Sequence, residues 1–135
     1  MNTEEIARWA YVLFVAIAII AGLAVGYMAF DNPLGFNDPG IADTHGWVIL
    51  IMLILGIIIG LTSITAKEMK PFLIATIALI VASSADVWYP LLKIEMLSLL
   101  YYWATAITGY IVAFAAPAAV IIGIKSVIAI AKEPQ

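Results

Sequence analysis

Long runs of apolar residues, separated by short polar stretches, make up most of this chain. Uncharged blocks cover residues 9–30, 46–66, 71–85 and 96–124. A helix needs about 20 predominantly apolar residues to cross the hydrocarbon core of a bilayer, and three of these blocks are long enough. The third block reaches that length only if it continues through DVWYPLL toward Leu92. The pattern therefore predicts an all-α fold of four transmembrane helices, arranged as two helical hairpins.

The first and fourth blocks have features of their own. Glu4 and Glu5 precede the first block where a secretory signal would have basic residues, so we expect a membrane helix there. The fourth block is the longest and contains Pro117. Proline removes a backbone donor and clashes with the preceding turn, which kinks a helix. We therefore predict one long fourth helix that is bent near Pro117.

Composition agrees with a membrane protein. The chain is 65% hydrophobic and 11% charged, against about 45–50% apolar and about 25% charged residues in soluble domains. Its 135 residues leave no room for a separate soluble domain, so residues 1–135 form a single all-helical hydrophobic domain. The absence of cysteine excludes disulfides and thiolate sites. A net charge of −3 disfavours extensive contact with nucleic acid.

Lysine and arginine are divided unevenly among the predicted connections. The first connection has none, and the third has Lys93 alone. Because cytoplasmic segments are enriched in these residues, we expect both termini and the second connection in the cytoplasm. The basic residues on that side are Arg8, Lys67, Lys70, Lys125 and Lys132.

Residues 30–47 are the longest stretch that apolar residues do not dominate, and they admit three interpretations. Asp31, Asp38, Asp43 and His45 could ligate a metal, form an acidic active-site rim, or belong to a water-facing turn. No metal is predicted, because their spacing matches neither a helical i, i+4 pair nor a fixed ligand loop. His45 adjoins Trp47 near the expected membrane surface, so we favour a hydrogen-bonded interfacial histidine over a pH switch.

Two turns and a helix cap explain the same stretch. DNPLG and NDPG place Pro33 and Pro39 shortly before glycines, a combination typical of tight turns. Asp43 and Thr44 then stand where the second helix is expected to need an N-cap.

Small residues at helical spacing indicate close packing between helices. GLAVG and GIIIG each place two glycines four residues apart, which lets helix backbones approach closely in lipid. Alanines provide similar smooth faces on the third and fourth helices. The residues predicted to serve helix packing and assembly are Gly22, Gly26, Gly56, Gly60, Ala78, Ala82, Ala115 and Ala119.

Candidate chemistry is sparse. Asp86 is the only ionisable residue that could lie well inside a span. Placing a carboxylate at the bilayer centre costs about 2.5–3.5 kcal/mol. A channel or proton-coupled carrier would use it, but the adjacent Trp88, Tyr89 and Pro90 favour an interfacial position. No nucleophile with a neighbouring base, phosphate loop or ligand cluster is present, so we expect neither an enzyme nor a cofactor.

The C-terminal stretch GYIVAFAAPAAVIIGIKSVIAIAKE carries a resemblance. Together with the hydrophobic spans, it resembles the highly hydrophobic major capsid proteins of archaeal spindle-shaped viruses, and the four-span size is similar to that of the tailed members. The resemblance implies an all-helical subunit that inserts among the lipids of the host membrane and then assembles with many copies of itself into the virion capsid. It implies no catalytic or binding residues.

A second resemblance keeps a cellular function open. GLTSITAKEMKPFLIATIALIVA is similar to small multi-span membrane proteins of archaea. The alternative is therefore a four-span membrane protein that acts as a channel or carrier, or as an accessory subunit of a membrane complex.

The charge pattern predicts sidedness. Cysteines introduced at Asn37 and at Gln135 of the otherwise cysteine-free chain should react with a membrane-impermeant thiol reagent from opposite faces of the membrane. Labelling intact and permeabilised vesicles measures this. Reaction of both positions from one face would contradict four spans.

Overall fold

The computed structural model describes residues 3–62 and 66–132, and these ranges contain helices and no strand. The α-helices are α1 (Thr3–Phe30), α2 (Pro39–Thr62), α3 (Ala66–Ser84) and α4 (Ser98–Lys132). Short 3-10 helices lie in the connections: η1 (Gly35–Asn37), η2 (Tyr89–Lys93) and η3 (Glu95–Leu97). The predicted all-α fold of four apolar, membrane-length helices is confirmed.

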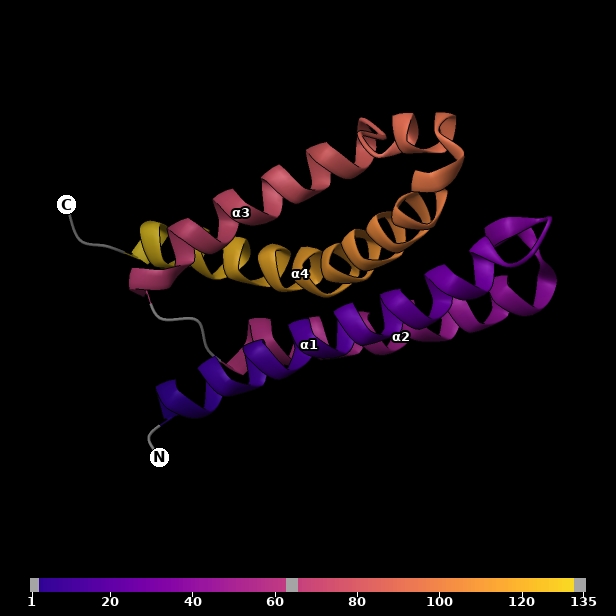
Figure 1. Cartoon of the computed structure of the whole chain (residues 1–135). Coiled ribbons are helices and arrows are strands. Elements are labelled where there is room, and N and C mark those ends of the chain that lie inside the picture. The colour runs from indigo at the N-terminus through magenta and orange to yellow at the C-terminus, as the bar shows by residue number, and fades with distance from the viewer. Residues whose placement is uncertain (1–2, 63–65, 133–135) are drawn as a thin grey trace.

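The fourth helix lies at the centre of the fold. α4 packs against α1, α2 and α3, and α1 also packs on α2. The main neighbour of α3 is α4, and its Phe72 ring also meets Tyr11 of α1 at a centroid distance of 5.8 Å. Figure 1 shows α4 between α3 on one side and the α1–α2 hairpin on the other. The start of α1 and the end of α4 lie at one end of the molecule, and the connection between α1 and α2 lies at the opposite end.

α4 is long and bent, as predicted. Its 35 residues make a helix about 52 Å long at about 1.5 Å per residue, which exceeds the hydrocarbon thickness of about 30 Å. Pro117 lies inside the helix and has no N–H for an intrahelical bond. The helix continues to Lys132, beyond the predicted end at Ile124.

The glycines of α1 are in contact with α4. A Cβ at Gly22 would collide with the backbone and side chain of Ile107. At Gly26 it would lie 2.9 Å from Trp103 Cδ1 and 2.9 Å from the carbonyl oxygen of Tyr102. Trp103 also reaches across the interface, because its Nε1 donates to the carbonyl oxygen of Leu23 at 3.0 Å. Any larger residue at either glycine would therefore push α1 away from α4.

The glycines of α2 are in the same situation. A Cβ at Gly56 would collide with the carbonyl oxygen of Phe114 and would lie 2.9 Å from Cγ of Pro117. At Gly60 it would lie 3.1 Å from Cα of Ala118. The glycine faces of α1 and α2 thus serve contacts within one chain, and their role in contacts between copies stays a prediction.

The four predicted alanines divide between the interior and the surface. Ala115 is buried on α4, and Ala119 is half-buried. On α3, Ala82 is half-buried and Ala78 is exposed. The fold therefore uses the α4 alanines internally and leaves part of the α3 alanine face free.

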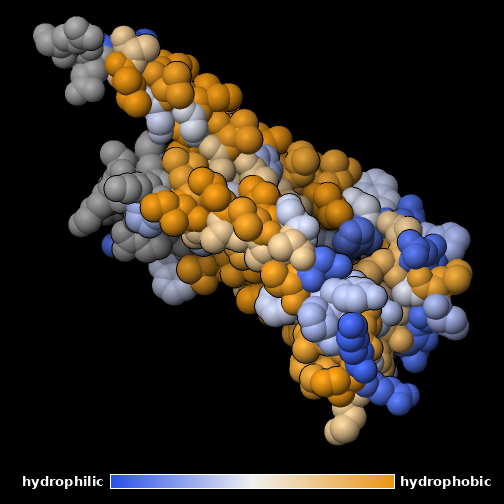
Figure 2. All heavy atoms as spheres, turned by 90° about the horizontal axis from the view of Figure 1, so that it is seen from above, coloured by the Kyte–Doolittle hydropathy of each residue, from blue (hydrophilic) through white to orange (hydrophobic). Residues whose placement is uncertain are grey.

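The outside of the bundle is apolar along its length. Ile20 is 67% exposed on α1, Ile74 is 58% exposed on α3, and Ile130 is 70% exposed on α4. Figure 2 shows hydrophobic side chains over most of one face. Hydrophilic side chains gather at the end that carries the α1–α2 and α3–α4 connections. Soluble monomers rarely expose contiguous apolar surface on this scale. The four apolar helices are those of a small membrane protein.

Gly56→Leu should destabilise the fold by about 1–3 kcal/mol, because the side chain must displace the α4 backbone. Gly123→Leu is the matched control, since a Cβ at Gly123 meets no atom within 4 Å. Its stability should stay within about 0.5 kcal/mol of wild type. Reversible unfolding in mixed micelles, followed by circular dichroism, measures both. Equal losses would contradict the packing of α2 on α4.

Candidate functional site

Asp38 caps the N-terminus of α2. Its Oδ2 accepts hydrogen bonds from the backbone N–H of Gly40 at 3.1 Å and of Ile41 at 3.2 Å. Pro39 follows as the first residue of the helix, a position that suits proline because its N–H would have no partner there. The NDPG stretch is thus a helix start and not a turn.

The prediction of Asp43 and Thr44 as the N-cap is wrong, because α2 begins several residues earlier, at Pro39. Thr44 lies inside the helix, where its Oγ1 donates to the carbonyl oxygen of Gly40 at 3.1 Å. Asp43 is exposed in the first turns of α2, where a negative charge interacts favourably with the positive end of the helix dipole.

The predicted turn at DNPLG is present at residues 31–34. The side-chain oxygen of Asn32 accepts a hydrogen bond from the N–H of Leu34 at 2.9 Å. Gly35 follows with φ +58°, in the left-handed region that favours glycine, and is buried against the ring of Tyr102. The turn is therefore anchored to α4.

His45 is hydrogen-bonded, as expected, and its partner is Tyr110 of α4. The Nδ1 atom of His45 lies 2.8 Å from the Tyr110 hydroxyl, and the two ring centroids are 5.2 Å apart. The Phe36 ring packs beside the His45 imidazole in a tilted arrangement, with a centroid distance of 5.8 Å. Tyr110 is 0% exposed, whereas His45 is partly exposed. This pair joins α2 to α4 through side chains.

An aromatic cluster of Phe30, Phe36, Tyr101 and Tyr102 continues from this pair. Tyr102 is its centre, with ring centroids 6.2 Å from Phe30, 5.5 Å from Phe36 and 5.2 Å from Tyr101. Such pairs contribute about 0.5–1.5 kcal/mol each beyond the area they bury. The cluster fastens the first connection to the start of α4.

Asp86 lies outside the helical part of the third span. α3 ends at Ser84 and does not continue as an α-helix to Leu92. Asp86 is exposed and has φ 55°, a left-handed conformation of the kind that commonly ends a helix. Its backbone oxygen accepts from the N–H of Tyr89 at 3.1 Å, where η2 begins. This position agrees with the interfacial interpretation of Asp86.

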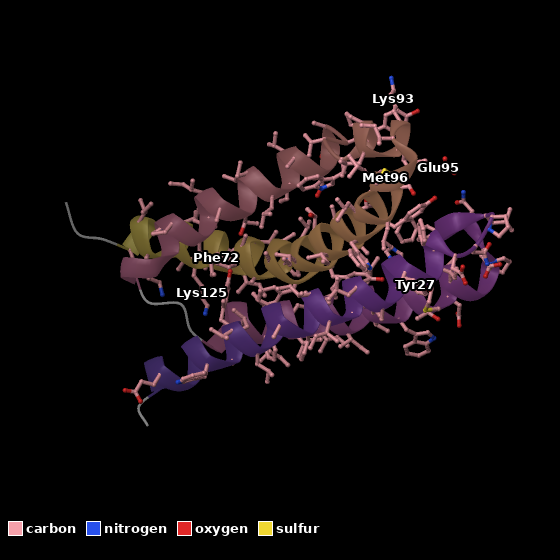
Figure 3. All side chains as sticks on the ribbon, viewed as in Figure 1. Tyr27, Phe72, Lys93, Glu95, Met96 and Lys125 are labelled. Atoms are coloured by element: carbon pink, nitrogen blue, oxygen red, sulfur yellow. The ribbon has the colours of Figure 1, made fainter. Side chains whose placement is uncertain are left out.

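The opposite end of the bundle is held by Lys125. Its Nζ donates to the carbonyl oxygens of Gly60 at 2.7 Å and of Leu61 at 2.9 Å, the last turn of α2. Figure 3 shows Lys125 reaching from α4, while Lys93 and Glu95 lie at the other end and point away from the bundle. The ammonium group satisfies carbonyl oxygens that have no partner within α2, and it interacts favourably with the negative end of the helix dipole.

Three of these functional contacts gave little or no sequence signal. Tyr110 and Trp103 are single aromatic residues inside an apolar block, where nothing in the sequence names a partner. Lys125 is one of several basic residues on the predicted cytoplasmic side, and nothing in the sequence indicates that it caps α2. The aspartates and His45 of the first connection do not converge: among the described residues, no three His, Asp or Glu side chains lie close enough to hold a metal ion.

No protein family, curated protein or solved structure matches the chain. The geometry supports a small membrane protein whose polar side chains mainly cap helices and join them to one another.

Asp38→Ala should lower the stability of the protein by about 1 kcal/mol, because two N–H groups of α2 lose their acceptor. Asp38→Asn should retain most of the stability, since an amide oxygen also caps. Asp43→Ala, at an exposed position of α2, is the control for loss of charge alone. Unfolding in mixed micelles measures all three. A loss in the Asn variant equal to that in the Ala variant would rule out the cap.

Proposed function

We propose that this protein is a structural membrane subunit that works by assembling with copies of itself. Its most specific form is the coat subunit of an archaeal spindle-shaped virus, inserted in the host membrane before assembly and then part of the virion. The resemblance of the C-terminal stretch and the four-span size support this form. The observation that carries self-assembly is a set of small residues that the chain does not use in its own packing.

These free small residues lie on α3 and α4. On α3, Ala75 and Ala78 are exposed one turn apart. On α4, a Cβ at Gly109 or at Gly123 would meet no atom within 4 Å. The two glycines are fourteen residues apart in the sequence, which places them near one face of a helix.

Small residues favour helix association in lipid for a physical reason. Lipid tails are as apolar as the side chains they would replace, so burial alone gives no drive, and close van der Waals contact decides which helices associate. The glycines of α1 and α2 already serve this purpose inside the chain. The free faces of α3 and α4 leave the same kind of contact open to a second copy.

Three of the polar residues that a channel or carrier could use are bonded locally or lie outside the α-helices. Thr76 is buried and its Oγ1 donates to the carbonyl oxygen of Phe72 at 2.9 Å in the same helix. The Ser98 hydroxyl donates to the carbonyl oxygen of Glu95 at 2.9 Å. Asp86 is exposed beyond the end of α3. These positions favour a structural subunit over a transport pathway.

Electron microscopy of the purified full chain tests the proposal. We expect ordered tubes, sheets or spindles for wild type, and dispersed particles for Ala78→Leu and Gly123→Leu, because a bulky side chain separates the backbones of adjacent copies. Val120→Leu is the control, since Val120 is already large and is 61% exposed. Discrete single-chain particles for wild type would overturn self-assembly. Regular arrays without spindles or tubes would support a self-assembling membrane subunit but would contradict its assignment as a viral coat protein.

A further inference from the structure

The hydrogen bond between His45 and Tyr110 joins two helices at a place that water can approach. His45 lies six residues into α2, about 9 Å along the helix from its start. It is partly exposed, while Tyr110 is completely buried on α4. A proton from the aqueous phase at this end can therefore reach the imidazole, whereas the hydroxyl has no contact with solvent.

Protonation of His45 leaves only one possible direction for this hydrogen bond. A neutral imidazole can accept the Tyr110 hydroxyl proton at Nδ1, which lies 2.8 Å away. A protonated imidazole carries hydrogens on both nitrogens and can only donate. The Tyr110 oxygen would then accept, and its own hydrogen would need another acceptor in a fully buried position. An unsatisfied buried donor is costly, so the contact between the helices is weakened.

We propose that His45 and Tyr110 form a proton-sensitive latch, which closes the N-terminal part of α2 against α4 when His45 is neutral and loosens it when His45 is protonated. The sequence alone did not favour this role, because a histidine beside an interfacial tryptophan needs no special partner. The completely buried partner is the observation that changes the interpretation. The latch does not depend on the proposed assembly function.

Other titratable groups around His45 are engaged elsewhere or exposed to solvent. The carboxylate of Asp38 caps α2, and Asp43 and Tyr27 are exposed. On the elements packed against this part of α2, the nearby titratable residues are Tyr27, Asp31, Asp38, Tyr101, Tyr102 and Tyr110, and Asp43 lies on α2 itself.

Amide hydrogen exchange of the full chain in lipid nanodiscs tests the latch. Protection factors, which are corrected for the intrinsic pH dependence of exchange, are compared at about pH 8 and about pH 5.5, on either side of the ordinary histidine pKa. For residues 41–48 we expect protection to fall about tenfold at the lower pH. Residues 52–59, deeper along α2, serve as the internal reference and should change little.

Two variants separate the latch from a general effect of acid. His45→Gln cannot titrate, and Tyr110→Phe keeps the ring but has no hydroxyl to leave unsatisfied. Both should lose the pH dependence of protection at residues 41–48, whatever their protection at pH 8. Equal protection of wild type at the two pH values would overturn the latch. A full pH response in Tyr110→Phe would do so as well, since the response would then not involve the hydroxyl.

Discussion

The close approach of α1 and α2 to α4 is the constraint on which the rest of this structure depends. In lipid, association between helices relies on dense packing rather than on removal of apolar surface from water. Glycines on α1 and α2 bring their backbones against the α4 backbone at distances that no other residue permits. α4 is thereby the common neighbour of the other three helices, and its length and bend decide where each of them can lie.

Polar side chains at the two ends of the bundle secure this arrangement. Asp38 satisfies N–H groups at the start of α2, and Lys125 satisfies carbonyl groups at its end. Because Lys125 belongs to α4, the cap also ties α2 to α4 along a parallel course. His45 and Tyr110 make a second tie between the same helices near the first connection. In a membrane, where backbone groups find little water, such ties substitute for hydration.

Internal and external small faces have separate roles in the proposed function. The glycines of α1 and α2 already make close contacts within one chain. The exposed alanines of α3 and the open glycines of α4 have no such role within the chain. A subunit organised in this way can reach its folded form in the membrane before it meets another copy, and assembly then adds contacts without rebuilding the bundle.

The sequence by itself determined the helical class, the number of membrane-length helices, their hairpin order and the long bent fourth helix. Each of these follows from uninterrupted apolar length and from proline chemistry, which act locally along the chain. The same local rules led to a wrong N-cap for α2, because Asp38 and Asp43 are equally able to cap and only the course of the chain selects between them. Tertiary structure alone decided that the glycines face α4, that His45 meets Tyr110 and that Lys125 caps α2. The three hydrogen bonds between α2 and α4 join residues at least 64 positions apart, and no periodic pattern records which apolar face of one helix meets which face of another.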